Sequence, residues 1–386
     1  MRSAVIVDAV RTPIGRSHAE RGVYRDTRSD DLAAACVQSL VARTGIDPGL
    51  IDDLVLGCAN QTLEQGINVA RIVALIAGLP ARVGGTTVNR LCGSGLQSLN
   101  QAAHAIAARA EDIQIVGGLE HMHHLPMGHG IDINPRLFQH TSKSALLMGV
   151  TAEYLAKSRG ISRREQDEYA CESHRRAASA FAAGEFAREI IPMPGRDEQG
   201  RATTVTRDIP IRPETTVEAL AGLSPAFQPD GGTVTAGNSS PLSDGAAALL
   251  VMSEETARSH GYRPLARIRS TAVVGLAPAN MGLGPVPATE LALRRAGLTL
   301  QDIDIVEMNE AFAVQTIACL RDLQLDPAKT NLRGGAIALG HPLGASGARI
   351  VTTLVHLLQD RDATFGLATM CVGLGQGMAT IIERMP

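Results

Sequence analysis

The sequence predicts an α/β protein built from two related halves, with a further domain inserted between them. Strand-like runs alternate with segments of helical periodicity, which is typical of parallel, layered α/β sheets. The pattern of the N-terminal third also returns in the C-terminal third at a constant offset of 252 positions. A chain of 386 residues is long enough for two or three packed units.

The elements follow from runs of apolar and β-branched residues, and from apolar residues that recur every three or four positions. In the first half we expect strands over 4–10, 51–56, 86–88 and 112–117, and helices over 30–42, 68–77 and from Ser94 onward. In the C-terminal third, 303–306 and 365–370 have the character of strands.

The repeat is carried by identical residues in matching places. Pairs separated by 252 positions are Gly45 and Gly297, Ile51 and Ile303, Asp52 and Asp304, Ser94 and Ser346, and Gly95 and Gly347. A constant register with few identities predicts two copies of one α/β unit packed against each other. Chance can supply apolar matches, but a Ser-Gly pair at the start of both helices is harder to obtain that way.

The segment between the halves, roughly residues 121–240, has a different character. Helices rich in alanine and arginine are expected over 149–159 and 163–183, and prolines and glycines break up residues 192–213. We therefore expect an inserted domain that lies over one face of the protein.

Four histidines, His121, His123, His124 and His129, begin this segment in a stretch with little periodicity. Such a cluster can bind a metal ion, but no carboxylate or cysteine stands at a familiar ligand spacing from it. We expect a polar loop here and no metal site.

Composition and charge argue against several classes of protein. With 45% hydrophobic and 19% charged residues the composition is globular, and no apolar run approaches the roughly 20 residues of a membrane helix. A formal net charge of −3 gives no reason to expect nucleic acid as a partner.

The cysteines and the two ends of the chain indicate a compartment. Six widely spaced cysteines without a CxxC pair indicate reduced thiols. A strand-like run from Ala4 leaves no room for a secretory signal, and Arg384-Met385-Pro386 does not match a peroxisomal address. We expect a cytoplasmic protein.

The stretch Asn89-Arg90-Leu91-Cys92-Gly93-Ser94-Gly95 carries a cysteine at the junction of a strand and a helix. Free N–H groups and the helix dipole at such a junction favour a thiolate, so we expect a lowered thiol pKa at Cys92. A cysteine taken alone is more often buried and inert. Two later stretches favour the reactive interpretation.

The first is Gly334–Gly347, in which glycines and a proline hold His341 in a stiff loop before a helix. The internal offset matches this loop to the loop of Cys92, so a thiol and an imidazole would meet, and the imidazole could take the thiol proton. Asn309-Glu310 directly follows a strand, which is a common place for a site in α/β sheets. A helix N-cap with an acidic first turn explains this pair equally well.

The second is Cys371-Val372-Gly373-Leu374-Gly375-Gln376-Gly377, which follows a strand-like run. Another cysteine on a glycine-rich turn can act as an acid and a base, and the N–H groups of Gly373 and Gly375 are suited to hold an oxyanion. The glycines can also mark a tight turn and nothing more.

Taken together, these motifs resemble the thiolase family over the whole chain. The resemblance also includes Val7-Asp8-Ala9-Val10-Arg11-Thr12-Pro13, Thr235–Ser240 and Ser243–Ala246. Further stretches are most similar to the thiolases of bacterial fatty-acid β-oxidation complexes: Thr62–Gly66, His121-Met122, Pro126-Met127 and His129-Gly130.

The resemblance implies a five-layered αβαβα fold from two pseudo-equivalent halves plus an inserted loop domain. We expect an N-terminal half over 1–120 to which 241–265 returns, a loop domain over 121–240 that covers coenzyme A, and a C-terminal half over 266–386. It also implies a homodimer, and a heterotetramer with the multifunctional hydratase/dehydrogenase subunit of the β-oxidation complex.

The resemblance assigns roles to five residues. Cys92 is implied to be the nucleophile that attacks the 3-keto carbon of an acyl-CoA, and His341 activates it. Asn309 holds a water molecule that, with His341, stabilises the enolate of the departing acetyl-CoA. Cys371 protonates this enolate and later deprotonates incoming coenzyme A. The N–H groups of Cys92 and Gly373 cradle the oxyanion.

Coenzyme A is implied to be a substrate, with no metal or redox cofactor. Residues that match family contacts to coenzyme A, its pantetheine channel and the acyl pocket are Ser240, Arg212, Phe227, Phe312, Met148 and Met281. Surface or core roles remain plausible for each of these residues.

The main alternative is a biosynthetic acetoacetyl-CoA thiolase, which runs the same chemistry toward condensation. Leu147 stands before Met148-Gly149-Val150-Thr151 where short-chain synthetic enzymes tend to carry histidine, and this weakly favours longer acyl chains. A ketoacyl synthase fits less well because of Cys371. A non-catalytic lipid carrier fits less well because the four motif residues, Cys92, Asn309, His341 and Cys371, are all intact. A cysteine hydrolase fits less well because thiolases exclude water from the acyl-enzyme.

Overall fold

The computed structural model describes residues 2–386, and its centre is one mixed sheet of ten strands. The strand order is β10-β11-β12-β9-β1-β8-β5-β3-β4, with β2 paired to β8. The strands are β1 (Ala4–Arg11), β2 (Gly15–Arg16), β3 (Asp53–Gly57), β4 (Thr86–Val88), β5 (Ile113–His121), β8 (Ser243–Ser253), β9 (Ala266–Gly275), β10 (Ile305–Met308), β11 (Phe365–Val372) and β12 (Gln376–Arg384). A separate hairpin joins β6 (Met193–Arg196) to β7 (Ala202–Val205).

The helices are α1 (Ser29–Thr44), α2 (Val69–Ile76), α3 (Ser94–Ala108), α4 (Met148–Arg159), α5 (Arg163–Ala182), α6 (Val217–Ala221), α7 (Glu254–Ser259), α8 (Pro285–Ala296), α9 (Ala313–Leu323), α10 (Ala336–Leu339) and α11 (Leu343–Asp360). None of the helices within residues 2–386 is long and apolar enough to cross a membrane.

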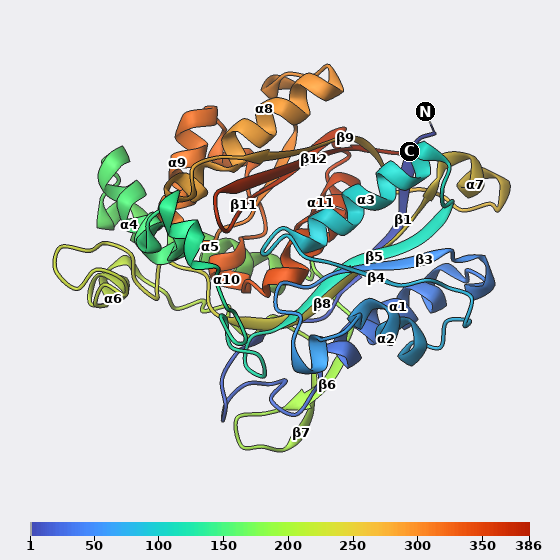
Figure 1. Ribbon diagram of the computed structural model, residues 1–386, viewed down its shortest axis with the longest axis horizontal. Coiled ribbons are helices and arrows are strands. Elements are labelled where there is room, and N and C mark those ends of the chain that lie inside the picture. The colour runs from blue at the N-terminus through green and yellow to red at the C-terminus, as the bar shows by residue number, and fades with distance from the viewer. Residues whose placement is uncertain (1) are drawn as a thin grey trace.

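The elements form five layers, as Figure 1 shows from α8 at the top to α1 and α2 at the bottom. The strands β4-β3-β5-β8-β1 form one half of the sheet, and β10-β11-β12-β9 form the other. The two halves of the sheet are joined where β1 pairs with β9, at Val5 with Arg267 and Ile6 with Ala266. Helices α3 and α11 lie between the two halves and share one buried apolar cluster with both. The αβαβα arrangement expected from the sequence is confirmed.

Equivalent hydrogen bonds occur within each of the two halves. The carboxylate of Asp52 accepts the backbone N–H groups of residues 112–113 at 2.9 and 3.0 Å. Asp304 does the same with residues 364–365, at 2.8 and 2.9 Å. Donors and acceptors are both displaced by 252 positions, so the repeat read from the sequence is a repeat of structure.

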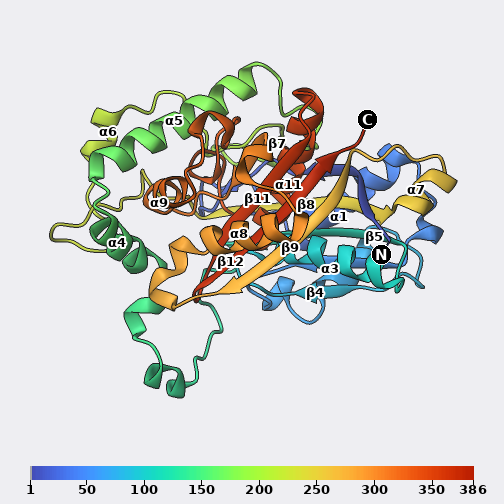
Figure 2. The same ribbon diagram turned by 90° about the horizontal axis from the view of Figure 1, so that it is seen from above.

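The halves differ in one connection. In the second half β11 is joined to β12 by residues 373–375, whereas in the first half the equivalent strands β5 and β8 are joined by residues 122–242. This long connection holds α4, α5, α6 and the β6–β7 hairpin, and Figure 2 shows its three helices together at one side of the molecule. A large covering segment therefore replaces a three-residue turn.

The central helices cross closely because glycine stands at the crossing. A methyl group at Gly95 would lie 2.7 Å from the carbonyl oxygen of Gly344, and one at Gly347 would lie 2.2 Å from the backbone nitrogen of Leu96. Only glycine allows this approach. The crossing brings the N-termini of α3 and α11 together, and the loops before these helices carry Cys92 and His341.

Substitution of Gly347 by alanine is expected to lower the free energy of unfolding by about 1–3 kcal/mol, because overpacking outweighs the gain in helix propensity. Thermal melting would measure the loss. Gly275→Ala is the matched control, since a methyl group there meets no atom within 4 Å. Equal melting temperatures for the two variants would contradict this packing argument.

Candidate active site

A cavity of about 120 Å³ opens where the N-termini of the two central helices meet. It is lined by both halves and by the inserted segment. The lining residues are Cys92, Met122, Met127, Met148, Phe227, Ser239, Ser240, Pro241, Leu242, Met281, Ala311, Phe312, His341, Leu343 and Cys371. Both cysteines and the histidine singled out by their motifs thus share one cavity.

The backbone before Cys92 is folded into a strained turn. Leu91 has a φ of 48°, a left-handed conformation that leucine rarely adopts. The side chain of Asn89 holds it by accepting the Leu91 N–H at 2.8 Å, and the Ser94 hydroxyl donates to the Leu91 carbonyl oxygen at 2.6 Å. These contacts fix the direction in which the thiol leaves the chain.

A second set of contacts joins the Cys92 loop to the turn after Cys371. Arg90 donates to the side-chain oxygen of Gln376 at 2.9 Å, across the interface between the halves. A methyl group at Gly93 would lie 2.5 Å from the Met378 sulfur, so the two segments pack without space for a side chain. The loop of one cysteine therefore positions the loop of the other.

The two nitrogens of the His341 imidazole have different partners, Ser346 at Nδ1 and Asn309 at Nε2. Ser346 donates its hydroxyl proton to the carbonyl oxygen of Pro342 at 2.8 Å, so its oxygen accepts from His341 Nδ1 at 2.6 Å. The proton therefore lies on Nδ1 and the lone pair on Nε2. The amide Nδ2 of Asn309 lies 3.4 Å from Nε2.

Asn309 is fully buried, and its side-chain oxygen has no hydrogen-bond partner among residues 2–386. Its backbone N–H donates to the carbonyl oxygen of Thr369 on the neighbouring strand β11 at 3.0 Å. The helix after this segment, α9, begins at Ala313 with Phe312 as its N-cap. Asn309 is therefore not the N-cap of that helix, and the N-cap interpretation is wrong.

Burial dominates the electrostatics of the cavity. Removal from water raises the pKa of the Cys92 thiol to about 11, and the nearby backbone N–H groups of Gly373 and of Cys92 itself offset this rise only in part. Burial, with the charge of Arg349 in second place, lowers the pKa of His341 to about 3. The pKa of Cys371 lies well above its usual value because the thiol is buried, and beside Cys92.

The prediction that the helix N-terminus lowers the pKa of Cys92 is therefore wrong. Desolvation disfavours the charged forms of both thiol and imidazole, and it outweighs the nearby N–H groups. At neutral pH the resting cavity holds two neutral thiols and a neutral imidazole.

This state predicts how Cys92 responds to pH. The thiolate is the form that reacts with iodoacetamide, so we expect alkylation of Cys92 to accelerate about tenfold per pH unit between pH 7 and 9. Peptide mass spectrometry would follow this cysteine separately from the other five. A rate that levels off below pH 8 would instead indicate a thiolate–imidazolium pair.

The coenzyme A contacts expected from the sequence divide into two groups. Five of the six residues line the cavity, and two of these, Phe227 and Phe312, meet edge to face with ring centroids 6.0 Å apart. Arg212 does not line the cavity. It is half-buried, and its backbone N–H donates to His174 at 3.2 Å.

Two family models match the chain: Thiolase, N-terminal domain, over residues 4–255, and Thiolase, C-terminal domain, over residues 262–384. The chain belongs to the thiolase family.

Thiolase relatives are similar along the whole chain. Proteins named 3-ketoacyl-CoA thiolase from Shewanella denitrificans and Aeromonas salmonicida are each 55% identical over 389 residues, which is 100% of this chain and 100% of each relative. The crystal structure of human mitochondrial 3-ketoacyl-CoA thiolase superposes with a TM-score of 0.90 at 40% identity, and that of the Bacillus anthracis acetyl-CoA acetyltransferase with 0.90 at 38%. Each match covers 100% of this chain and 99% of the other.

The histidine cluster of this thiolase lies beside the cavity and forms a stacked pair. The rings of His121 and His124 are 3.7 Å apart, and His124 bridges the Arg25 carbonyl oxygen and the Glu64 carboxylate at 2.8 and 3.0 Å. Within residues 2–386 no three His, Cys, Asp or Glu side chains are grouped to hold a metal. His124 therefore joins the start of the inserted segment to two loops of the N-terminal half.

Some residues that act on the thiolase site indirectly were not predicted from the sequence. Ser346 was noticed only as a repeat partner of Ser94, although both serines organise the loop that precedes their helix. Their identical position at offset 252 was the available signal. Arg90 and Gln376 had no signal, because their contact joins positions that are far apart in the chain.

Proposed function

We propose that this chain is a 3-ketoacyl-CoA thiolase, which uses coenzyme A to cleave 3-ketoacyl-CoA into acetyl-CoA and a shortened acyl-CoA. The observation that carries the proposal is the meeting of Cys92, His341 and Cys371 in one buried cavity beside the amide of Asn309. Carbon–carbon cleavage needs a nucleophile, a proton acceptor, a proton donor and a sink for negative charge. This group of side chains can supply all four.

In the first step Cys92 attacks the 3-keto carbon of the substrate. Nε2 of His341 is free to take the thiol proton because Ser346 holds the other nitrogen as N–H. Transfer of the proton as the sulfur attacks avoids a free thiolate, which the burial of Cys92 disfavours. The backbone N–H groups of Gly373 and Cys92 lie near this sulfur, so they are suited to hold the oxyanion formed on an acyl group attached to it.

Cleavage of the carbon–carbon bond leaves acetyl-CoA as an enolate. Its oxygen needs a donor, and the protonated Nε2 of His341 with a water molecule held by Asn309 would supply it. The thiol of Cys371 then protonates the enolate carbon. A thiol that burial keeps protonated is suited to this role.

In the second half-reaction the Cys371 thiolate takes the proton of incoming coenzyme A, whose sulfur attacks the acyl group on Cys92. The bond between the acyl group and Cys92 then breaks, and the Cys92 sulfur regains its proton from His341. Splitting the reaction at an acyl-cysteine replaces one difficult step by two easier ones. None of these reaction steps is an oxidation or a reduction. We therefore propose that coenzyme A is a substrate and that no further cofactor takes part. Ser240, Phe227, Phe312, Met148, Met281 and Arg212 remain the proposed contacts to coenzyme A and the acyl chain.

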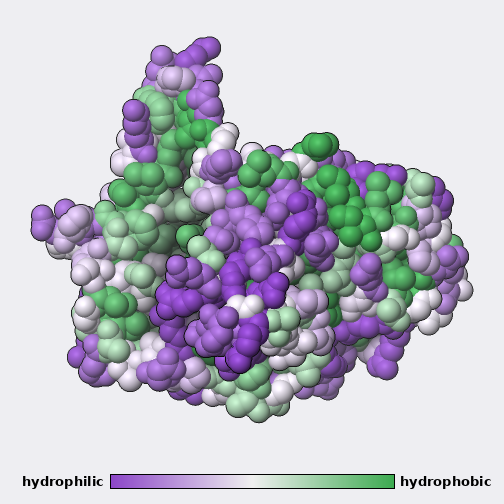
Figure 3. All heavy atoms as spheres, turned by 90° about the horizontal axis from the view of Figure 1, so that it is seen from below, coloured by the Kyte–Doolittle hydropathy of each residue, from purple (hydrophilic) through white to green (hydrophobic). Residues whose placement is uncertain are grey.

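We also propose a homodimer that associates with a hydratase/dehydrogenase subunit in cytoplasmic fatty-acid β-oxidation. Two exposed apolar groups favour association. Leu63 and Ile67, the latter 95% exposed, belong to one loop, and Met127 and Ile131 belong to the projecting segment between β5 and α4. The segments touch, since Asn60 donates to the Pro126 carbonyl oxygen. Figure 3 shows apolar atoms gathered on the projection and on the body beside it.

The test of the activity is thiolytic cleavage of 3-ketoacyl-CoA substrates from short to long chains, with coenzyme A present and absent. Cleavage that requires coenzyme A and favours medium or long chains supports the degradative enzyme. Activity confined to acetoacetyl-CoA would support the biosynthetic alternative, and cleavage without coenzyme A would support a hydrolase. Absence of cleavage at every length would refute the proposal.

A further inference from the structure

The carboxylate of Glu310 follows Asn309 in the chain, is 1% exposed and accepts four hydrogen bonds. One oxygen accepts from the Tyr169 hydroxyl at 2.9 Å and from the Asn331 amide at 2.8 Å. The other accepts from the Ser173 hydroxyl at 2.7 Å and from the Ile337 N–H at 3.2 Å. All four of these donors are neutral groups.

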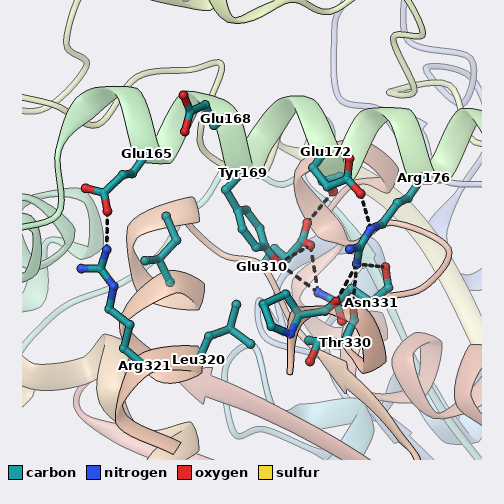
Figure 4. Close-up of a pocket in the computed structure, with 13 residues that line it drawn as sticks. Glu165, Glu168, Tyr169, Glu172, Arg176, Glu310, Leu320, Arg321, Thr330 and Asn331 are labelled. Atoms are coloured by element: carbon teal, nitrogen blue, oxygen red, sulfur yellow. Dashed lines mark hydrogen bonds and ion pairs between the residues drawn. The ribbon is translucent and has the colours of Figure 1, made fainter. Parts of the chain in front are cut away.

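These donors come from three separate parts of the protein. Tyr169 and Ser173 lie on α5 of the covering segment, Asn331 lies in the loop before α10, and Ile337 lies in α10 itself. Figure 4 shows Tyr169 reaching down from α5 and Asn331 reaching up from the opposite side to the same carboxylate. Glu310 therefore joins the covering segment to the core beside the cavity.

One contact leads from Glu310 to His341. The chain before α10 passes directly over the carboxylate. A methyl group at Gly335 would lie only 2.1 Å from the Glu310 carboxyl carbon. The N–H of Gly335 also donates to the Ser173 hydroxyl at 3.1 Å. From Ile337 the single turn of α10 leads to Gly340, and His341 follows.

Another contact leads from Glu310 to Asn309. The Asn331 side chain donates to the Met308 carbonyl oxygen at 2.9 Å and accepts the Met308 N–H at 2.8 Å. It thereby holds the residue before Asn309, while its bond to Glu310 holds the residue after it. The backbone of Asn309 is fixed from both sides.

We propose that Glu310 is a positioning residue that holds Asn309 and His341 at their mutual distance and links that geometry to the seating of α5. The inference rests on the proposed function, in which these two side chains stabilise the enolate. A carboxylate is needed because it only accepts hydrogen bonds. A glutamine would turn its NH₂ group toward either the Asn331 amide N–H or the Ile337 N–H, depending on which way its amide faces, and neither of these groups can accept a hydrogen bond.

The first experiment compares Glu310→Gln with Glu168→Gln in the full-length protein. Glu168 is an exposed carboxylate on α5 that pairs with Arg164, so the control makes the same chemical change away from the loops. Glu310→Gln is expected to lower kcat of thiolysis about 10- to 100-fold with KM within about twofold, because small misplacements of reacting groups are costly. An unchanged kcat, or a loss equal to that of the control, would overturn the proposal.

The second experiment separates positioning from general stability. If Glu310 acts by positioning Asn309 and His341, then Glu310→Gln should cost clearly less activity in an Asn309→Ala background than in the wild type, whereas independent effects would multiply. Multiplicative losses would therefore overturn the proposal. An inactive wild-type protein would refute the proposed function instead, which distinguishes the two failures.

Tyr169→Phe and Ser173→Ala remain informative if thermal melting shows that Glu310→Gln does not fold. Each keeps the carboxylate and removes one donor from α5. Each is expected to lower kcat by about threefold or more at an unchanged melting temperature, and to add little to Asn309→Ala. Full activity in both variants would overturn the proposal.

Discussion

Replacement of Cys92 by serine is expected to reduce thiolysis on the order of 10³-fold or more. The hydroxyl of serine is a far weaker nucleophile than a thiol near neutral pH, and His341 would have to remove a proton of much higher pKa. Steady-state cleavage of a 3-ketoacyl-CoA in the presence of coenzyme A measures the loss. The fold should persist because the serine side chain is smaller than that of cysteine.

The matched control for this change is Cys171→Ser. Cys171 lies on α5, is partly exposed and is outside the cavity, so its replacement should leave kcat unchanged. A Cys92→Ser variant with more than about a tenth of wild-type turnover would exclude Cys92 as the nucleophile, because loss of a nucleophile costs far more.

Replacement of Cys371 by alanine is expected to stop carbon–carbon cleavage while leaving acyl transfer to Cys92 possible. The enolate needs a proton donor to leave as acetyl-CoA, and loss of a general acid typically costs about 10²–10⁴-fold. A thioester that transfers its acyl group to Cys92 releases a thiolate, which is a much better leaving group than an enolate carbon. The two reactions should therefore respond differently.

Two assays on the Cys371→Ala variant test this difference. One measures cleavage of 3-ketoacyl-CoA, and the other measures by mass spectrometry the acyl group that Cys92 takes from a simple acyl-CoA. Unchanged cleavage would remove Cys371 from the mechanism. Loss of both reactions with an unchanged melting temperature would mean that Cys371 also serves acyl transfer.

The alternation of strands and helices could be predicted because the signals are local. Runs such as residues 4–10 and 303–306 are rich in Val and Ile, and the structure has β1 and β10 there within two residues at each end. The repeat could be predicted because glycine and aspartate serve specific backbone needs, as Asp52 and Asp304 do. These residues recur wherever the same turn recurs.

Strand β8 was not predicted, and composition explains why. Its sequence, Ser243–Ser253, contains glycine and three consecutive alanines, which have low strand propensity, and it is buried along its whole length. A strand buried on both faces lacks the alternation that identifies a half-exposed strand. Its pairing with β1 and β5 is set by long-range contacts that one sequence does not reveal.

Some chemical features of the site could also be predicted from the sequence, and others could not. The motifs of Cys92, His341 and Cys371 could be found because glycines and a proline mark their loops. The pKa of Cys92 could not be predicted, because it depends on how deeply the finished fold buries the thiol. The tautomer of His341 depends on Ser346, whose significance appears only when the hydrogen bonds are seen.

The acyl-cysteine intermediate is tested most directly by the mass of the peptide that contains Cys92 after incubation with a 3-ketoacyl-CoA and no free coenzyme A. We expect an acyl group two carbons shorter than the substrate, attached to Cys92 and released when coenzyme A is added. An acyl group on Cys371, an intact 3-ketoacyl group on Cys92, or no modified cysteine would contradict it.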